Sequence, residues 1–156
     1  MILATVTNKK YILSTINLIE SYKLHSFDST IFLYYFDLPH KALDFLNKRY
    51  GSQVVCREVE KVCDYAHEPR AFFYKSYAIK HANDQGADFI YSDGTNAFVR
   101  PTKDLAGDLR GHNRLFLQYP YEILKNKYWT TRRCFSEMGC DSPQYHDAPQ
   151  YWAGFQ

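Results

Sequence analysis

The sequence lacks several features that mark common classes of protein. It contains no run approaching the roughly 20 apolar residues that a membrane-spanning helix needs. Its apolar start, residues 1–6, is followed at once by polar and basic residues, which is unlike a secretion signal. We therefore expect a soluble, cytoplasmic protein with no membrane segment in the visible chain.

An excess of charge of one sign is also missing. The 19 Lys and Arg residues stand against 17 Asp and Glu residues, and the net charge is +2. A balance this small gives no basis for attraction to nucleic acid or to a membrane surface. Neither kind of partner is expected.

The cysteines lack the spacing of a metal site. Cys56, Cys63, Cys134 and Cys140 do not form pairs two to four residues apart, as a zinc knuckle requires. We expect them to be reduced and at least half-buried, as in most cytosolic proteins.

Two catalytic signatures are absent from the sequence. There is no GxxxxGK[ST] loop to cradle phosphates, which argues against a P-loop nucleotidase. There is no nucleophile elbow either, so a serine–histidine–acid triad has no support.

Aromatic residues, by contrast, are abundant. They make up 17% of the chain, with 14 Tyr and 11 Phe. Tyrosine buries its ring while its hydroxyl stays hydrated, which suits contacts to sugars or bases. The simpler interpretation is a tyrosine-rich core and surface, and composition alone does not separate the two.

Short apolar stretches alternate with helical ones along the chain. Strands are predicted over residues 2–7, 30–36, 53–59, 88–92 and 115–119. Helices are predicted over residues 11–22, 40–50, 71–83 and 127–138, and a loop over 141–149. This order predicts a single α/β domain over residues 1–156, with a mostly parallel sheet and helices on both of its faces.

Ligands of such sheets bind beyond the carboxyl ends of the strands. That rule selects residues 5–8, Asp37, Asp64 and residues 92–96. Acidic residues stand at three of these four ends, but Asp is also common in ordinary turns. Position alone therefore leaves function and turn formation equally open.

The most informative stretch is Tyr91 to Asn96, where a strand leads directly into a carboxylate. Asp93 could hold Mg²⁺ or Mn²⁺, or accept a hydrogen bond from a ribose hydroxyl. Gly94 would let a ligand approach the backbone, and Thr95 and Asn96 add neutral donors and acceptors. The alternative is an ordinary Asp-Gly turn.

Three segments together resemble the GT-A glycosyltransferases. Residues 73–101 resemble their central block of helix, apolar strand and Asp-x-Asp motif. Residues 4–11, ATVTNKKY, resemble their first strand and nucleotide loop, and residues 150–156, QYWAGFQ, resemble their later Ala-Gly segment. The resemblance implies a Rossmann-like fold of GT-A type that is C-terminally incomplete.

The resemblance also implies a site for a nucleotide-sugar donor. The base and ribose would be bordered by Thr5, Val6, Thr7 and Tyr11. The transferred sugar would be approached by Trp152, Ala153 and Gly154. Asp37 would stand beside the base or ribose, and Lys75 would face the diphosphate or Asp93.

One position departs from the family pattern. Thr95 stands where the second Asp of the motif would bind a metal, and a hydroxyl is a weaker ligand for a hard dication. Three interpretations stay open: metal held by Asp93 with a downstream ligand, metal-independent transfer using Lys75, or loss of activity.

The predicted function is transfer of a sugar from a nucleoside-diphosphate donor, with UDP favoured by family tendency, to a hydroxyl of a carbohydrate or other acceptor. Such a transfer needs a base near the acceptor hydroxyl, and the loop residues Asp141 and Asp147 are candidates. The alternative is a non-catalytic GT-A-like module that binds a nucleotide sugar or a protein partner. A nucleotidyltransferase is a weaker alternative, because residues 7–10 contain no glycine.

Overall fold

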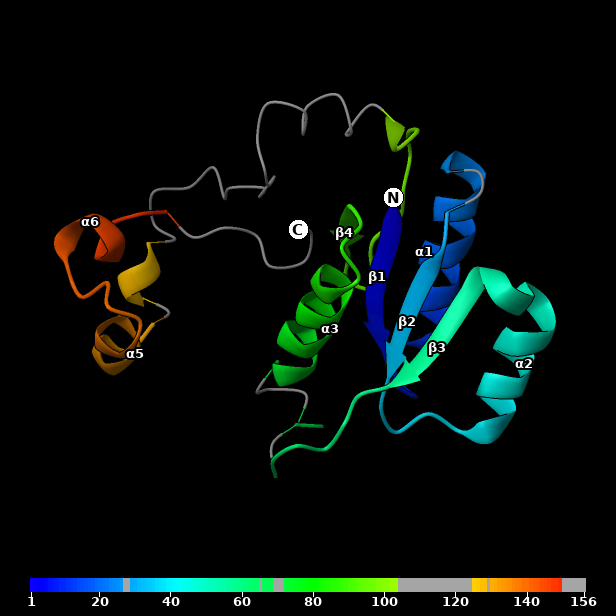
Figure 1. The fold of residues 1–156 in the computed structure, drawn as a ribbon, viewed down its shortest axis with the longest axis horizontal. Helices are drawn as coiled ribbons and strands as arrows, with labels where there is room; N and C mark the ends of the chain where they lie inside the picture. The colour runs from blue at the N-terminus through cyan, green and yellow to red at the C-terminus, as the bar shows by residue number, and fades with distance from the viewer. Residues whose placement is uncertain (27–28, 65, 69–71, 104–124, 129, 150–156) are drawn as a thin grey trace. The chain divides into compact units, whose positions relative to one another are not determined.

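The computed structural model describes residues 1–26, 29–64, 66–68, 72–103, 125–128 and 130–149 (Figure 1). The chain divides into two compact units, Met1–Asn113 and Arg114–Gln156, which are considered separately. Whether residues 1–156 act as a single domain stays a prediction. None of the helices in the described ranges is long and apolar enough to cross a membrane.

A four-stranded sheet forms the centre of the first unit. Its strands are β1 (Ile2–Thr7), β2 (Ile31–Tyr35), β3 (Val54–Glu58) and β4 (Phe89–Tyr91). They lie in the order β3-β2-β1-β4, and every pairing is parallel. The predicted α/β class with a parallel sheet is therefore confirmed.

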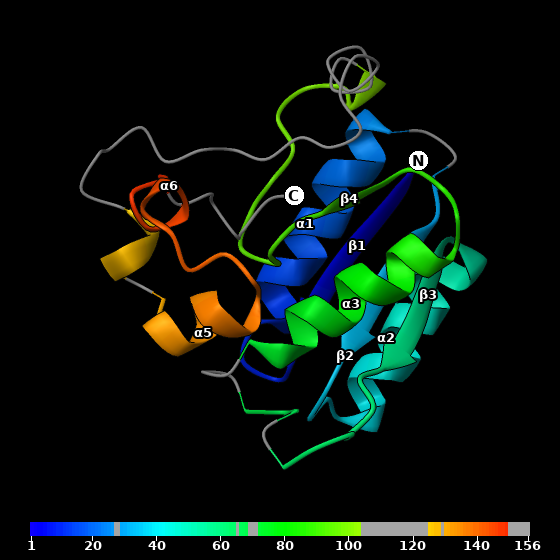
Figure 2. The ribbon, with the colours of Figure 1, turned by 60° about the vertical axis from the view of Figure 1, so that its left-hand side comes forward.

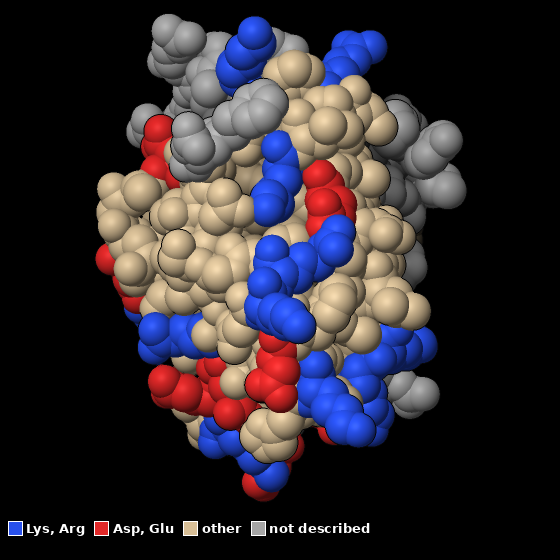
Figure 3. Space-filling model, turned by 90° about the vertical axis from the view of Figure 1, so that its right-hand side faces the viewer, with Lys and Arg blue, Asp and Glu red and all other residues tan. Residues whose placement is uncertain are grey.

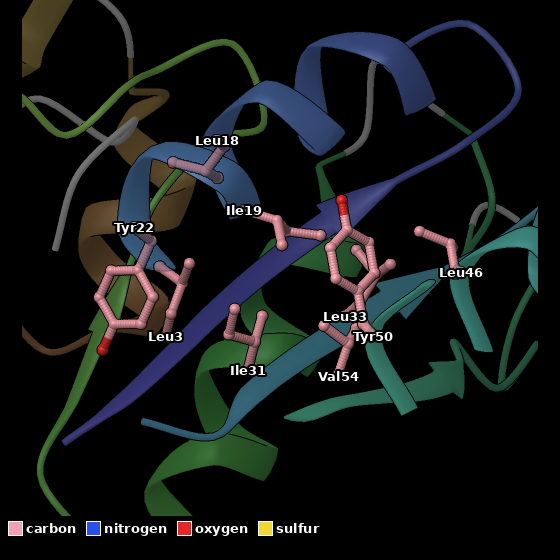
Figure 4. Close-up of a cluster of buried hydrophobic side chains, with 9 residues drawn as sticks. All are labelled: Leu3, Leu18, Ile19, Tyr22, Ile31, Leu33, Leu46, Tyr50 and Val54. Carbon is pink, nitrogen blue, oxygen red and sulfur yellow. The ribbon is translucent and has the colours of Figure 1, made fainter. Parts of the chain in front are cut away.

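One face of the sheet is covered by α1 (Ile12–His25) and α2 (His40–Tyr50) (Figures 1 and 2). Their apolar sides meet alternate residues of the strands in one buried cluster, since successive strand residues point to opposite faces. Figure 4 shows its members: Leu3, Leu18, Ile19, Tyr22, Ile31, Leu33, Leu46, Tyr50 and Val54.

The opposite face is covered by α3 (Phe73–Asp84). Ala78 and Ala82 are fully buried there, and they pack in a second cluster with Ala4, Val6 and Tyr91. Small side chains let the helix approach the sheet closely. Helices on both faces, as predicted, thus enclose the sheet in two apolar layers.

The second helix shows how a local signal fixes a boundary. α2 ends at Gly51, which has φ of +55° and donates its backbone N–H to the carbonyl of Asn47. Only glycine adopts such a conformation without strain, so the predicted cap is confirmed. A short 3₁₀ turn, η1 (Gly51–Gln53), then leads into β3.

The second unit differs from its prediction. The helix predicted over residues 127–138 is divided into η2 (Asn126–Tyr128) and α5 (Arg132–Glu137), with Thr131 capping α5. The loop predicted over 141–149 contains the short helix α6 (Pro143–His146), which begins with a proline in the position that favours helix starts. The strand predicted over 115–119 lies outside the described residues.

Charged side chains of both signs are interspersed on the face shown in Figure 3. Blue basic groups and red acidic groups adjoin one another there, in keeping with the small net charge of +2. That face therefore carries no extended field of one sign.

Candidate functional site

The parallel sheet brings two polar strand ends together. β1 ends at Thr7 and its neighbour β4 ends at Tyr91, two residues before Asp93. A pocket of about 180 Å³ opens at this edge of the sheet. Its lining residues are Val6, Thr7, Asn8, Tyr11, Phe36, Phe72, Tyr74, Lys75, Tyr91, Asp93, Gly94 and Thr95.

Two helices begin at this pocket. Tyr11 is the N-cap residue of α1 and Phe72 is that of α3, and neither side chain makes a capping hydrogen bond. The two residues are 39% and 55% exposed, and both line the pocket. Phe72 has φ of +54°, a strained conformation for a bulky residue. Strain of this kind is often retained at binding sites.

The carboxylate of Asp93 is held from two sides. Lys75 Nζ lies 2.8 Å from one oxygen, and the Tyr91 hydroxyl donates a 2.9 Å hydrogen bond to the other. The Lys75 and Asp93 side chains are only 16% and 31% exposed, so solvent screens the pair weakly. The Lys75 ammonium also lies 5.1 Å from the centre of the Phe72 ring, a cation–π contact.

Two tyrosines at the pocket have perturbed hydroxyls. Burial first, and the neighbouring Asp93 carboxylate second, raise the pKa of Tyr74 to about 12. The same two causes raise the pKa of the Tyr91 hydroxyl well above its usual value. Both phenols therefore stay protonated at neutral pH, and Tyr91 remains a hydrogen-bond donor to Asp93.

Three of the lining residues, Thr7, Tyr11 and Gly94, pack tightly around Thr15 of α1. The single hydroxyl proton of Thr15 is shared between two acceptors, Thr7 Oγ1 and the Tyr11 carbonyl oxygen, each 3.0 Å from Thr15 Oγ1, and this joins α1 to the end of β1. A Cβ atom added to Gly94 would overlap Thr15 Oγ1 and crowd its Cβ. Gly94 thus lets the turn after β4 lie directly against α1.

Some residues predicted to bind the nucleotide-sugar donor do not line this pocket. Thr5 is fully buried within β1, and its hydroxyl has no hydrogen-bond partner among the described residues. Asp37 does not line the pocket, and instead pairs with Lys9 at 2.8 Å. Asn96 is not a lining residue either, and its side chain donates to Ser92 Oγ at 3.1 Å.

The predicted catalytic base belongs to the second unit. Asp147 lies 2.6 Å from Lys127 and 3.6 Å from Lys125. The hydrogen bond from Lys127 is the main cause that lowers the pKa of Asp147, which makes the carboxylate a weaker base. The predicted sugar-binding residues Trp152, Ala153 and Gly154 lie outside the described residues.

A divalent cation fits this pocket poorly. Asp93 is the single acidic residue among the described residues that line it, and both of its oxygens already have partners. Within the described ranges, no group of three His, Cys, Asp or Glu side chains could hold a metal ion. Mg²⁺ and Mn²⁺ prefer several oxygen ligands. Metal binding by Asp93 therefore stays a prediction without support from its neighbours.

Five lining residues were not predicted as site residues: Asn8, Phe36, Phe72, Tyr74 and Tyr91. Asn8 lies within residues 5–8, the range that the rule for parallel sheets selects after the first strand. A signal for Tyr91 was also present, because residues two apart on a strand project to the same side. Nothing local in the sequence points to Phe72.

The comparisons with known proteins support the fold. The sequence matches no protein-family model, and no curated protein matches it. Among matching solved structures is that of the bifunctional glycosyltransferase WbbM in its apo form. It matches with a TM-score of 0.56 and 13% identity, over 99% of this chain and 30% of that one. The chain thus has a glycosyltransferase-like fold and spans about a third of that protein's length.

Proposed function

We propose that the chain binds a nucleoside-diphosphate sugar in the pocket at the ends of β1 and β4 and takes part in glycosyl transfer. The observation that carries the proposal is the meeting of Thr7, Lys75 and Asp93 at one pocket. A sheet of this class places its ligands at that edge. The glycosyltransferase-like fold adds support for the type of reaction.

The lining suits the parts of such a donor. Tyr11 offers an exposed ring on which a base can stack, and the exposed Thr95 offers a hydroxyl to a ribose. Lys75 supplies positive charge for a diphosphate. The volume of about 180 Å³ is smaller than the roughly 300–1,000 Å³ of most small-molecule sites, so the pocket would hold part of the donor.

The reaction proposed is a displacement at the anomeric carbon of the sugar. The bond from that carbon to the diphosphate oxygen breaks, and its electron pair leaves with the nucleoside diphosphate. An acceptor hydroxyl oxygen forms the new bond, and its proton passes to a base. Asp147 stays the candidate base, and UDP stays the favoured nucleotide.

Binding and turnover measurements on the full chain test this function. Calorimetry with UDP, GDP, ADP and CDP, and with their sugar derivatives, should find one nucleotide that binds. Asp93→Ala should weaken that binding at least about tenfold, because Lys75 loses its partner and is repositioned. Unchanged affinity in Asp93→Ala would reject the placement of the site.

Turnover separates the enzyme from the binding module. Release of free nucleoside diphosphate from the sugar donor, followed by chromatography, should exceed the rate of a protein-free control. Binding without any release would favour the non-catalytic alternative. The observation that favours this alternative is Thr95, which stands at the position of the second Asp in the Asp-x-Asp motif.

A further inference from the structure

We propose that the Lys75 ammonium takes the place of the divalent cation beside the diphosphate, and that Asp93 and Tyr91 position it. The inference rests on the proposed function and names how that site recognises its ligand. Asp93, in this view, contacts the ammonium and not a metal. The proposal follows from the contacts, charges and burial of the described pocket residues.

The first step concerns charge. Lys75 and Asp93 are the two charged residues among the described residues that line the pocket, and they neutralise each other. A dication bound to Asp93 would have to displace the Lys75 ammonium from the carboxylate or lie beside its positive charge, and Asp93 would be its one carboxylate ligand among the described pocket residues. Displacing Lys75 would leave a mostly buried ammonium without its carboxylate partner, which is costly.

The second step concerns the lysine. An ammonium carries three N–H donors, and its bond to Asp93 uses one of them. No hydrogen bond from the other two donors to a described residue is found, so we infer that they can reach phosphate oxygens. The side chain is 16% exposed and lies along the Phe72 ring, so little conformational freedom is lost when a phosphate binds. The lysine is thus held ready as a point charge.

The third step concerns the helices. α1 and α3 have 14 and 12 residues, and both begin at the pocket through their N-cap residues Tyr11 and Phe72. The N-terminal end of a helix carries partial positive charge that favours a phosphate group. The Lys75–Asp93 pair has no net charge. The two helix N-termini beside it therefore add the positive potential that a diphosphate needs.

The fourth step concerns Tyr91. Its hydroxyl is nearly inaccessible to solvent, and it donates to the Asp93 oxygen that Lys75 leaves vacant. This bond fixes the carboxylate plane and so directs the other oxygen at Lys75. Tyr91 therefore acts on the ligand through Asp93 and is a positioning residue.

The test begins with the unaltered full chain and requires no variant. Binding of the nucleoside diphosphates UDP, GDP, ADP and CDP is measured by calorimetry, first in EDTA and then with Mn²⁺. The affinity of the nucleotide that binds should agree within about twofold in the two buffers. Binding that requires Mn²⁺ overturns the inference and leaves the proposed function standing. Absence of binding in both buffers rejects the proposed function itself.

Variants of the lysine then identify the contact. Lys75→Gln should weaken nucleoside-diphosphate binding at least about tenfold, while the matching nucleoside without phosphates changes less than about twofold. Lys75→Arg should retain part of the affinity, because it keeps the charge. Lys80→Gln is the matched control, since Lys80 lies on the same helix in an exposed pair with Asp84. Equal losses for nucleotide and nucleoside in Lys75→Gln would overturn the inference.

The positioning role has its own pair of variants. Tyr91→Phe should weaken the nucleoside diphosphate about three- to tenfold and spare the nucleoside. Tyr34→Phe is its control, because it removes another buried hydroxyl, bonded to His81 at 2.7 Å. If both tyrosine variants reduce nucleotide affinity alike, the loss is one of general stability and the role given to Tyr91 is wrong.

Discussion

Gly94 is a residue at which the pocket tolerates little change. Its backbone lies against Thr15, whose Oγ1 is already committed to Thr7 and the Tyr11 carbonyl. Gly94→Ala should therefore lower the free energy of unfolding by about 1–3 kcal/mol, because overpacking forces Thr15 out of these bonds. Urea unfolding of the full chain measures the change.

A double-mutant cycle tests the cause. In a Thr15→Ala background the added methyl group meets no hydroxyl, so Gly94→Ala should cost at least about 0.5 kcal/mol less than it does alone. Simple additivity of the two losses would show that another contact is responsible.

Single residues also show how far the sequence predicts the site. The strand-end rule or the family resemblance predicted Thr7, Lys75 and Asp93 as site residues, and the structure brings all three to one pocket. Phe72 was not predicted as a site residue, because its position depends on a left-handed backbone conformation that no local sequence pattern encodes. Asp37 follows a strand end as expected, yet its pairing with Lys9 draws it away from the lining.

At the level of elements, α3 is the helix that carries Lys75 and rests on the sheet through alanines. Ala78 is fully buried against the sheet, so Ala78→Leu should lower the free energy of unfolding by about 1–3 kcal/mol. Ser76→Leu adds a similar side chain on the exposed side of the same helix and should change stability by less than about 0.5 kcal/mol. Thermal unfolding monitored by circular dichroism compares the two, and equal losses would contradict this packing.

Elements with strong periodicity were predicted well, and those without it were not. β1 and α2 combine apolar spacing with a clear stop signal, and their observed bounds match those predicted. α1 has the spacing without a stop signal, and it continues to His25, beyond its predicted end at residue 22. The described residues between 126 and 146 form turns and helices of six residues or fewer. Pieces this short are decided by caps and tertiary contacts more than by periodicity.

At the level of the whole molecule, buried tyrosines make stability sensitive to high pH. Burial raises the pKa of Tyr34 and Tyr50 to about 12, from about 10 in the unfolded chain. Between pH 10 and pH 12 the unfolded state loses phenolic protons that the native state keeps. Since the unfolded state then binds fewer protons, the free energy of unfolding falls as pH rises from 10 to 12.

This expectation can be checked by urea unfolding at pH 8 to 11.5. The free energy of unfolding should change little near pH 8 and should fall above pH 10. Tyr34→Phe should reduce this fall in the free energy of unfolding by about 1–2 kcal/mol over the window, whereas Tyr128→Phe changes an exposed ring and should not. A slope that Tyr34→Phe leaves intact would contradict the assignment to buried phenols.

The position of β1 has a consequence for how the chain is made on the ribosome. β1 finds β2 some 30 residues later, but its other edge meets β4 only after residue 89 has emerged. Until then the nascent chain exposes an apolar strand edge, the kind of surface to which chaperones bind and at which chains associate wrongly. Asp93 follows β4, so under the proposed function the nucleotide-sugar site could form only after this second edge of β1 has been paired.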